Sequence, residues 1–171
     1  MRTLSAWLVV FAAVGLLAGC KDIMDKIRGG PPEVKPPEVQ PPEVKPPPGE
    51  LVLEVEAFTK LEEAQVKDLA GASGGKAVFF DSETSAAETS VPLTKGTWEV
   101  TLFMQGTDED QDAVYLDVAG TEQRLFPQDY GKVMAVEPFT VEVAKDGAVK
   151  VVLMAAETGV YLDKVVLKKV K

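Results

Sequence analysis

Short runs in which apolar and polar residues alternate follow one another along residues 51–171, with turn-forming residues between the runs. In the clearest run, Trp98, Val100, Leu102 and Met104 alternate with more polar residues. Because successive side chains of a strand point to opposite faces, this pattern predicts a strand with one buried face and places Trp98 in the core. The pattern predicts further strands at 51–57, 77–80, 114–118, 139–143, 149–153 and 160–167.

The connections between these runs complete the fold prediction. Residues 61–69 are predicted to be irregular or a strand, with a helical turn or two as the alternative, and Asp146-Gly147 predicts a hairpin turn. Seven to nine strands at this spacing, in a segment long enough to bury a core, indicate one all-β domain over 51–171. The predicted fold is an antiparallel two-sheet β-sandwich of the jelly-roll kind.

The first residues of the chain have the organisation of an export signal. Arg2 supplies a positive charge, and residues 4–17 are almost wholly apolar. That run is too short to cross a bilayer, which takes about 20 residues, so it predicts a signal peptide over 1–19. The ending Leu17-Ala18-Gly19-Cys20 resembles the lipobox of bacterial lipoproteins. An ordinary secreted protein with one spare thiol is the alternative.

The lipobox resemblance implies that Cys20 carries lipid, palmitate included, and anchors the chain in a membrane. Several acyl chains hold a protein stably, whereas a single chain binds reversibly. Residues 20–30 would form the anchor segment. Because Lys21 rather than an aspartate follows Cys20, the resemblance implies the outer membrane of a bacterium that has two. The expected location is the cell envelope, on its periplasmic or surface-facing side.

Residues 31–50 repeat a proline-rich pentad, PPEVK, PPEVQ, PPEVK and PPPGE, which holds nine of the 12 prolines. Proline fixes φ and donates no backbone hydrogen bond, so this segment predicts a disordered tether with polyproline II character. At ~3.1 Å per residue, about 18 residues would span roughly 55 Å. We interpret it as a spacer, and a ligand for a proline-binding module is the alternative.

Composition excludes several kinds of chemistry. The chain has a net charge of −9, no histidine and one cysteine. An acidic chain does not attract nucleic acid, because binding to phosphates requires lysine and arginine. Without histidine or a free thiol, Ser-His-Asp and Cys-His catalysis and zinc sites of the usual kind are excluded. The chemistry that remains belongs to carboxylates, hydroxyls, amines and a few aromatic rings.

The order of motifs in 51–168 resembles the β-jelly-roll carbohydrate-binding modules of families six and thirty-five, in the galactose-binding-like class. The motifs that carry this resemblance are Glu54-Val55-Glu56, the glycine turn Gly74-Gly75 before 76–78, Gly96-Thr97-Trp98, the strand and turn at 112–120, and Gly159-x-x-x-Asp163-x-x-x-Leu167. The resemblance implies a structural calcium ion held by Glu54, Glu56, Asp163 and backbone oxygens near Lys76. Carboxylates from separate strands suit calcium, and Glu54 and Glu56 would share one strand face. Alternatively, both glutamates belong to the solvated face of an edge strand.

A second acidic cluster, 108–112, does not match an EF-hand. Its sixth position is Ala113 instead of glycine, and its twelfth is Ala119 instead of glutamate. A solvated acidic loop is the favoured interpretation. We also hypothesise that Asp112, Glu157 and Asp163 form one polar cluster.

The resemblance further implies a sugar site, which needs an exposed aromatic ring with polar groups beside it. The candidate ligand-binding residues are Phe126, Gln128, Asp129 and Tyr130, with Tyr161 as a further aromatic. Tyr130 is the first choice for stacking because an amide and a carboxylate precede it. A tyrosine packed under its own loop is the alternative.

The sequence therefore predicts a membrane-anchored, non-catalytic lipoprotein that binds a polysaccharide. A structural lipoprotein that binds an envelope protein is the alternative. A carboxylate-pair hydrolase is the third class, and no pair of acidic residues in the sequence points to it.

Overall fold

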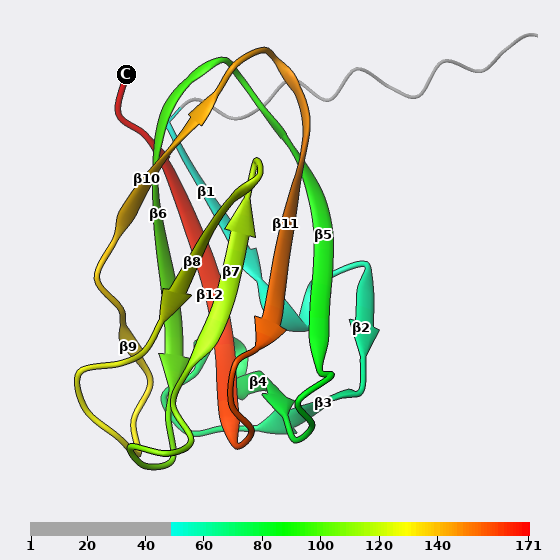
Figure 1. The fold of residues 1–171 in the computed structure, drawn as a ribbon, viewed down its shortest axis with the longest axis vertical. Helices are drawn as coiled ribbons and strands as arrows, with labels where there is room; N and C mark the ends of the chain where they lie inside the picture. Colours follow the sequence, from blue (N-terminus) through cyan, green and yellow to red (C-terminus); the bar gives the residue numbers. More distant parts are fainter. Residues whose placement is uncertain (1–48) are drawn as a thin grey trace, which may run out of the picture. The chain divides into compact units, whose positions relative to one another are not determined.

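The structure is a computed structural model, and it describes residues 49–171. Two antiparallel sheets lie face to face (Figure 1). Sheet A has seven strands, in the order β10 (Phe139–Val143), β6 (Gly96–Gln105), β12 (Val160–Lys169), β4 (Lys76–Phe80) and β3 (Ala64–Asp68), with β1 (Glu50–Glu54) paired to β12 and β9 (Met134–Ala135) paired to β6. Sheet B has five strands, in the order β2 (Lys60–Glu62), β5 (Ala86–Leu93), β11 (Gly147–Ala155), β7 (Val114–Val118) and β8 (Thr121–Leu125). The predicted all-β antiparallel sandwich is confirmed.

The inward faces of the two sheets form one hydrophobic core. Leu102 and Leu162 from sheet A and Leu116 and Leu153 from sheet B are all fully buried. Trp98 is also in this core, as predicted, and its indole N–H donates a 2.9 Å hydrogen bond to the Thr94 carbonyl. The indole therefore contributes a large apolar surface while its one polar group remains satisfied.

Most connections carry the chain from one sheet to the other. The segment around Asp146-Gly147 leads from β10 in sheet A to β11 in sheet B, so the predicted hairpin there is wrong. Asp146 instead links the β10–β11 connection to the β5–β6 connection. Its Oδ1 accepts a 2.6 Å hydrogen bond from the Lys95 N–H between β5 and β6. A tight hairpin does join β7 to β8, through Ala119 and Gly120, which both have positive φ.

Residues 61–69 are strands, β2 and β3, which is one of the two structures predicted for them. The predicted first strand, by contrast, ends earlier than expected. Strand β1 ends at Glu54, and a 3-10 turn, η1 (Val55–Ala57), follows it. The turn directs Val55 into the core, where the side chain is fully buried. Glu54 and Glu56 therefore do not share one strand face, which corrects that prediction.

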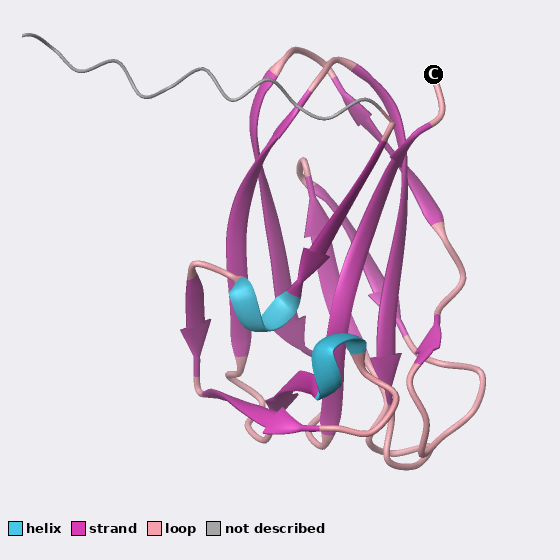
Figure 2. Ribbon diagram, turned by 180° about the vertical axis from the view of Figure 1, so that it is seen from behind, coloured by secondary structure: helices cyan, strands magenta, loops and turns pink. Residues whose placement is uncertain are grey.

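Strand β12 lies in the middle of sheet A and contains a bulge. Its pairing with β6 shifts between Leu162 and Lys164, so Asp163 has no partner on β6. Leu162 and Asp163 are both buried, while Tyr161 and Lys164 on either side are partly exposed. A bulge allows two consecutive side chains to point to the interior. Figure 2 shows β12 between β1 and β6, with η1 and a second 3-10 turn, η2 (Ser73–Gly75), close to β1 and β12.

The burial of a side chain predicts how much stability its truncation to alanine costs. Leu102→Ala removes a side chain that is fully buried between the sheets, so we expect the free energy of unfolding to fall by about 2–5 kcal/mol. Val52→Ala on β1 removes a side chain that is 47% exposed, and it should change that free energy by no more than about 0.5 kcal/mol. Urea denaturation of both variants measures the difference. Equal losses would mean that the two sheets do not pack through Leu102.

Candidate functional site

Two of the three carboxylates predicted as metal ligands, Glu54 and Asp163, meet at Ser73 in the η2 turn. Asp163 Oδ1 accepts a 2.6 Å hydrogen bond from the Ser73 N–H, and Glu54 Oε1 accepts a 2.9 Å hydrogen bond from the Ser73 hydroxyl. The second oxygens of Glu54 and Glu56 are buried, and neither has a hydrogen-bond partner within residues 49–171. The structure thus brings Glu54 at the end of β1 and Asp163 in the bulge of β12 to one polar site at Ser73.

The chemistry of this site suits a hard cation. Burial raises the pKa of Asp163, and the neighbouring Glu54 raises it further, while the Ser73 N–H and Lys164 act in the opposite sense. Within residues 49–171, no three acidic, cysteine or histidine side chains are close enough together to form a finished metal site. The buried second oxygens of Glu54 and Glu56 nevertheless have no partner among these residues, and a buried charge needs one.

A row of side chains crosses the outer face of sheet A beside this site. Gln65 of β3 is opposite Phe79 of β4, Phe79 is opposite Tyr161 of β12, and Tyr161 is opposite Gln105 of β6. Directly opposed residues of antiparallel strands project from the same face of a sheet. These four residues form a continuous row, here called the aromatic platform, with two rings in the centre and an amide at each end.

The contacts of the platform fit recognition of a hydroxyl-rich ring. The rings of Phe79 and Tyr161 are 4.5 Å apart and tilted by 39°. Lys67 Nζ lies 3.5 Å from the centre of the Phe79 ring, and Gln65 donates a 2.5 Å hydrogen bond to Asp81. Aromatic faces stack on the C–H face of a sugar, while amides and amines reach its hydroxyl groups.

Sequence reasoning missed most of this platform. The sequence predicts a strand at 77–80 without distinguishing its two faces, although Val78 and Phe80 are fully buried and Phe79 is partly exposed. Strand alternation within Ala77–Phe80 would have separated Phe79 from the two core residues. Gln65 and Gln105 carried no signal of their own, because only the strand register places them beside the rings.

The predicted residues Tyr130 and Asp129 lie close to one edge of the platform. Tyr130 forms an isolated bridge with Gly106, the residue after Gln105, and the Gly131 N–H donates a 3.0 Å hydrogen bond to Gly106. Tyr130 is 42% exposed. Asp129 binds within its own loop, with a 2.6 Å ion pair to Lys132 and a 2.9 Å hydrogen bond from the Tyr130 N–H. Asp129 therefore shapes the loop, and Tyr130 is the side chain of this pair that remains available to a ligand.

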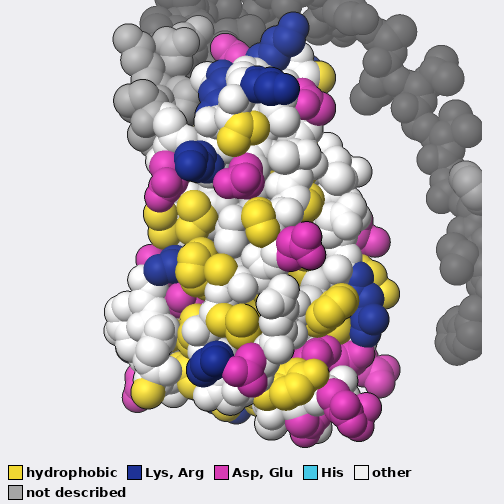
Figure 3. Space-filling model, turned by 90° about the vertical axis from the view of Figure 1, so that its left-hand side faces the viewer, with side chains coloured by type: hydrophobic (Ala, Val, Ile, Leu, Met, Phe, Trp, Pro, Cys, Tyr) yellow, Lys and Arg dark blue, Asp and Glu magenta, His cyan; other side chains and the backbone are white. Residues whose placement is uncertain are grey.

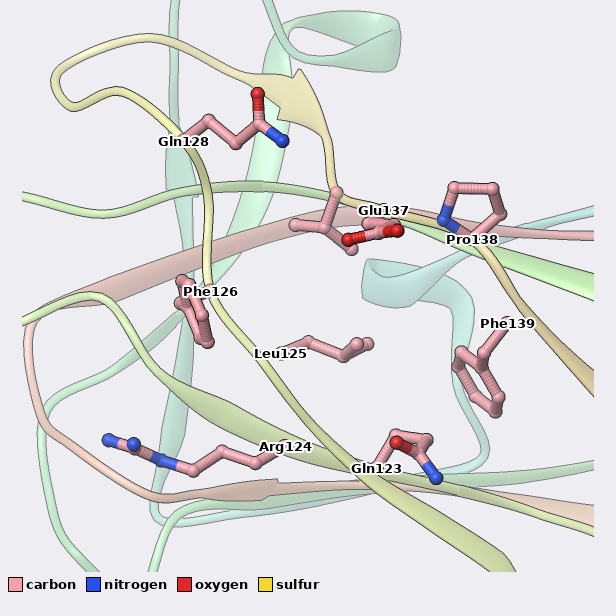
Figure 4. Close-up of a pocket in the computed structure, with 9 residues that line it drawn as sticks. Gln123, Arg124, Leu125, Phe126, Gln128, Glu137, Pro138 and Phe139 are labelled. Atoms are coloured by element: carbon pink, nitrogen blue, oxygen red, sulfur yellow. The ribbon is translucent and has the colours of Figure 1, made fainter.

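The predicted residues Phe126 and Gln128 lie in a different place, a groove of about 220 Å³ between the edges of the two sheets. We call it the seam groove. Figure 4 shows the Phe126 and Phe139 rings on either side of Leu125, with Gln128 and Glu137 above them. The groove is lined by Gln123, Arg124, Leu125, Phe126, Gln128, Val136, Glu137, Pro138 and Phe139. The four predicted ligand-binding residues thus belong to two separate surfaces.

The acidic segment 108–112 also divides in the structure. Asp108, Glu109 and Asp110 are exposed, as expected for a solvated loop, whereas Asp112 is buried beside Glu157. Figure 3 shows a concentration of acidic side chains at this end of the domain. Within the described part of the chain, no hydrogen bond or ion pair joins Asp112 or Glu157 to Asp163. The hypothesis of one cluster therefore holds for the first two residues, and Asp163 belongs to the site around Ser73.

Glu157 organises this end of the domain. Its Oε2 accepts 3.1 Å hydrogen bonds from the N–H groups of Asp112 and Ala113, and its Oε1 is 2.5 Å from Arg124. The hydrogen bond from the Asp112 N–H is the main cause that lowers the pKa of Glu157. The pKa of Asp112 is raised, first by burial and then by the neighbouring Glu157. Partial burial and the carboxylates of Asp112 and Glu109 also raise the pKa of the Tyr130 phenol.

The predicted membrane attachment depends on residues that the structure does not describe. Cys20 and the segments 1–19, 20–30 and 31–48 lie outside the described residues, so their predicted roles stay predictions. Among residues 49–171, no helix has the length and apolar character needed to cross a bilayer.

No family model and no curated protein matches the chain. Solved structures do match it. A carbohydrate-binding module from the lichenase 5A of Cellvibrio mixtus, solved with cellotriose, has a TM-score of 0.57 at 15% identity and covers 71% of this chain and 98% of its own. A family 35 module from Clostridium thermocellum has a TM-score of 0.59 at 12% identity, with the same two coverages.

The domain has the fold of a carbohydrate-binding module. An exo-β-1,3-galactanase from Phanerochaete chrysosporium also matches, with a TM-score of 0.59 at 20% identity over 69% of this chain. The match spans 29% of the galactanase chain, so it concerns one part of that enzyme. The two modules, by contrast, are matched over nearly their whole length. At these identities the likeness establishes the fold of residues 49–171.

The pH dependence of the free energy of unfolding tests how Glu157 stabilises the end of the domain that contains Asp112. Glu157→Gln replaces a charged acceptor, so we expect the free energy of unfolding at pH 7 to fall by about 1–2 kcal/mol. The lowered pKa of Glu157 means that its stabilisation is present above the ordinary pKa of a glutamate and is lost as the pH falls through the folded-state value. The stability curves of the two proteins should therefore converge in acid.

Urea denaturation across pH measures both quantities. Glu122→Gln on β8 is the matched control, because Glu122 is exposed and should cost little. If the free energies of unfolding of the parent and of Glu157→Gln differ by the same amount down to acidic pH, the charge of Glu157 does not stabilise this end of the domain.

Proposed function

We propose that residues 49–171 form a non-catalytic carbohydrate-binding domain whose aromatic platform holds part of a polysaccharide. The observation that carries this proposal is the row Gln65, Phe79, Tyr161 and Gln105 across four strands of sheet A. Its two rings and two amides combine stacking and hydrogen bonding on one solvent-facing surface. The likeness to modules described as carbohydrate-binding supports the same class of ligand.

Two lysines extend the hydrogen-bonding capacity of the platform. Lys67 lies over Phe79, and Lys164 Nζ lies 5.0 Å from the centre of the Phe103 ring. Both amines can donate hydrogen bonds to hydroxyl or acidic groups of a sugar. Tyr130 borders the end of β6 and supplies a further ring at the loop side.

The arrangement of carboxylates favours binding over hydrolysis. A retaining glycosidase holds its two carboxyl groups ~5–5.5 Å apart, and an inverting one ~6.5–9.5 Å apart. Asp112 and Glu157 are close enough for a direct side-chain hydrogen bond, and Glu157 is already engaged by two backbone N–H groups and Arg124. This pair leaves no room for a substrate between its members.

Calcium and the membrane anchor complete the proposal. Glu54, Glu56 and Asp163 would hold the ion, and their two orphaned oxygens support this assignment. Bound there, calcium would supply charge compensation that joins β1 and η1 to β12. Lipidated Cys20 and the proline-rich tether would place the domain at a membrane of the cell envelope, as the sequence predicts.

Removal of either platform ring should weaken glycan retention. We expect Phe79→Ala and Tyr161→Ala to weaken binding of the full chain at least about 10-fold, because each removes a stacking surface. Affinity electrophoresis in gels that contain β-1,3- or β-1,4-linked polysaccharides measures the effect. Tyr115→Ala is the matched control, since Tyr115 is a partly exposed tyrosine on sheet B. Retention by none of the polysaccharides would contradict the proposal and favour an envelope protein as partner.

Calcium should raise the melting temperature of the full chain. A ligand at 100 times its dissociation constant stabilises by about 2.7 kcal/mol. Glu54→Gln and Asp163→Asn should each remove the calcium-dependent part of this rise, whereas Glu62→Gln, an exposed glutamate on β2, should retain it. Thermal scans with calcium and with a chelator test the assignment. Identical melting temperatures in both conditions would exclude these three carboxylates as a calcium site.

A further inference from the structure

The seam groove lies where the two sheets do not cover each other. On one side is β8, the edge strand of sheet B, and on the other are β9 and β10 at the edge of sheet A. Its floor includes Leu125 and Val136, which are only 8% and 3% exposed. The groove shares no residue with the aromatic platform, so the two surfaces can be tested separately.

Of the two rings of the groove, Phe126 is open to solvent and Phe139 is partly buried. Phe126 is 57% exposed, while every aromatic ring that points into the core is nearly or fully buried. Phe139 packs against the core with one side and lines the groove with the other. A groove between two such rings presents apolar surface without closing over it, as a stacked ligand requires.

The polar groups of the groove have free hydrogen-bonding capacity. Within residues 49–171, no side-chain hydrogen bond engages the amides of Gln123 and Gln128 or the carboxylate of Glu137. Figure 4 shows Gln128 and Glu137 above the rings, with the head group of Arg124 directed away. Arg124 is instead bound to Glu157. The groove thus offers amides and one carboxylate, and its nearest cation is occupied elsewhere.

This chemistry selects the charge and the size of a ligand. Amides and a carboxylate bind hydroxyl groups, whereas a lone carboxylate repels an acidic sugar. The volume of about 220 Å³ is below the ~300–1,000 Å³ of typical ligand pockets, so it suits a single ring. The platform differs, because the Lys67 amine lies over its Phe79 ring.

We propose that the seam groove is a second glycan-binding site, which stacks one uncharged sugar unit against Phe126 and binds its hydroxyls through Gln123, Gln128 and Glu137. The inference takes its ligand class from the proposed function and uses none of the platform residues. With two sites, one domain contacts a long polysaccharide twice. Two linked contacts bind a polymer more tightly than either contact alone.

Glutamine side chains report on the two surfaces in a single experiment. Gln65 and Gln105 belong to the platform, Gln123 and Gln128 belong to the groove, and Gln111 belongs to neither. The full chain, labelled with ¹⁵N-glutamine, would be titrated with neutral β-1,4-linked gluco-, xylo- and manno-oligosaccharides and β-1,3-linked gluco- and galacto-oligosaccharides. We expect saturable shifts of the Gln123 and Gln128 amide signals with at least one of them.

Phe126→Ala is the decisive variant, because its exposed ring contributes little to the core. It should weaken the groove response about 10-fold and leave the Gln65 and Gln105 shifts unchanged. Shifts of Gln65 and Gln105 alone would overturn the second site and leave the platform intact. Shifts of Gln123 and Gln128 alone would support the groove and contradict the platform. No shift of Gln123 or Gln128 with any oligosaccharide overturns the inference.

Discussion

The bulge in β12 is the constraint on which the candidate sites depend. A regular strand would direct Leu162 and Asp163 to opposite faces, whereas the shift in pairing buries both. Leu162 then packs in the core, and Asp163 meets Ser73 close to Glu54. The same irregularity leaves Tyr161 and Lys164 on the outer face. One local change of register thus connects the core, the carboxylate site and the aromatic platform.

The fold could be predicted from the sequence because its strands bury one face and leave the other in solvent. Trp98 and its neighbours alternate cleanly, and their burial follows that alternation. The end of β1 and the crossing at Asp146 could not be predicted. Whether a strand continues or turns after Glu54 depends on packing of Val55 between distant elements, and a turn motif does not specify which sheet the next strand joins.

The candidate site was only partly predictable, for a similar reason. The family resemblance identified Glu54, Glu56 and Asp163, and the structure brings Glu54 and Asp163 together at Ser73. The ligand-binding prediction relied on aromatic residues in loops, and therefore found Tyr130 and Phe126. It overlooked Phe79 and Gln65, because a surface built across four strands depends on register between residues far apart in the sequence.

The pairing of β1 with β12 joins residues at opposite ends of the domain, with Glu50 opposite Lys168. Sheet A consequently cannot form completely until β12, the last strand, is present. Most other strand pairings also join residues that are far apart in the sequence. Such contacts form slowly, because loop closure costs entropy before the contacts stabilise the fold. An emerging chain of this topology can therefore complete sheet A only once its C-terminal strand is present.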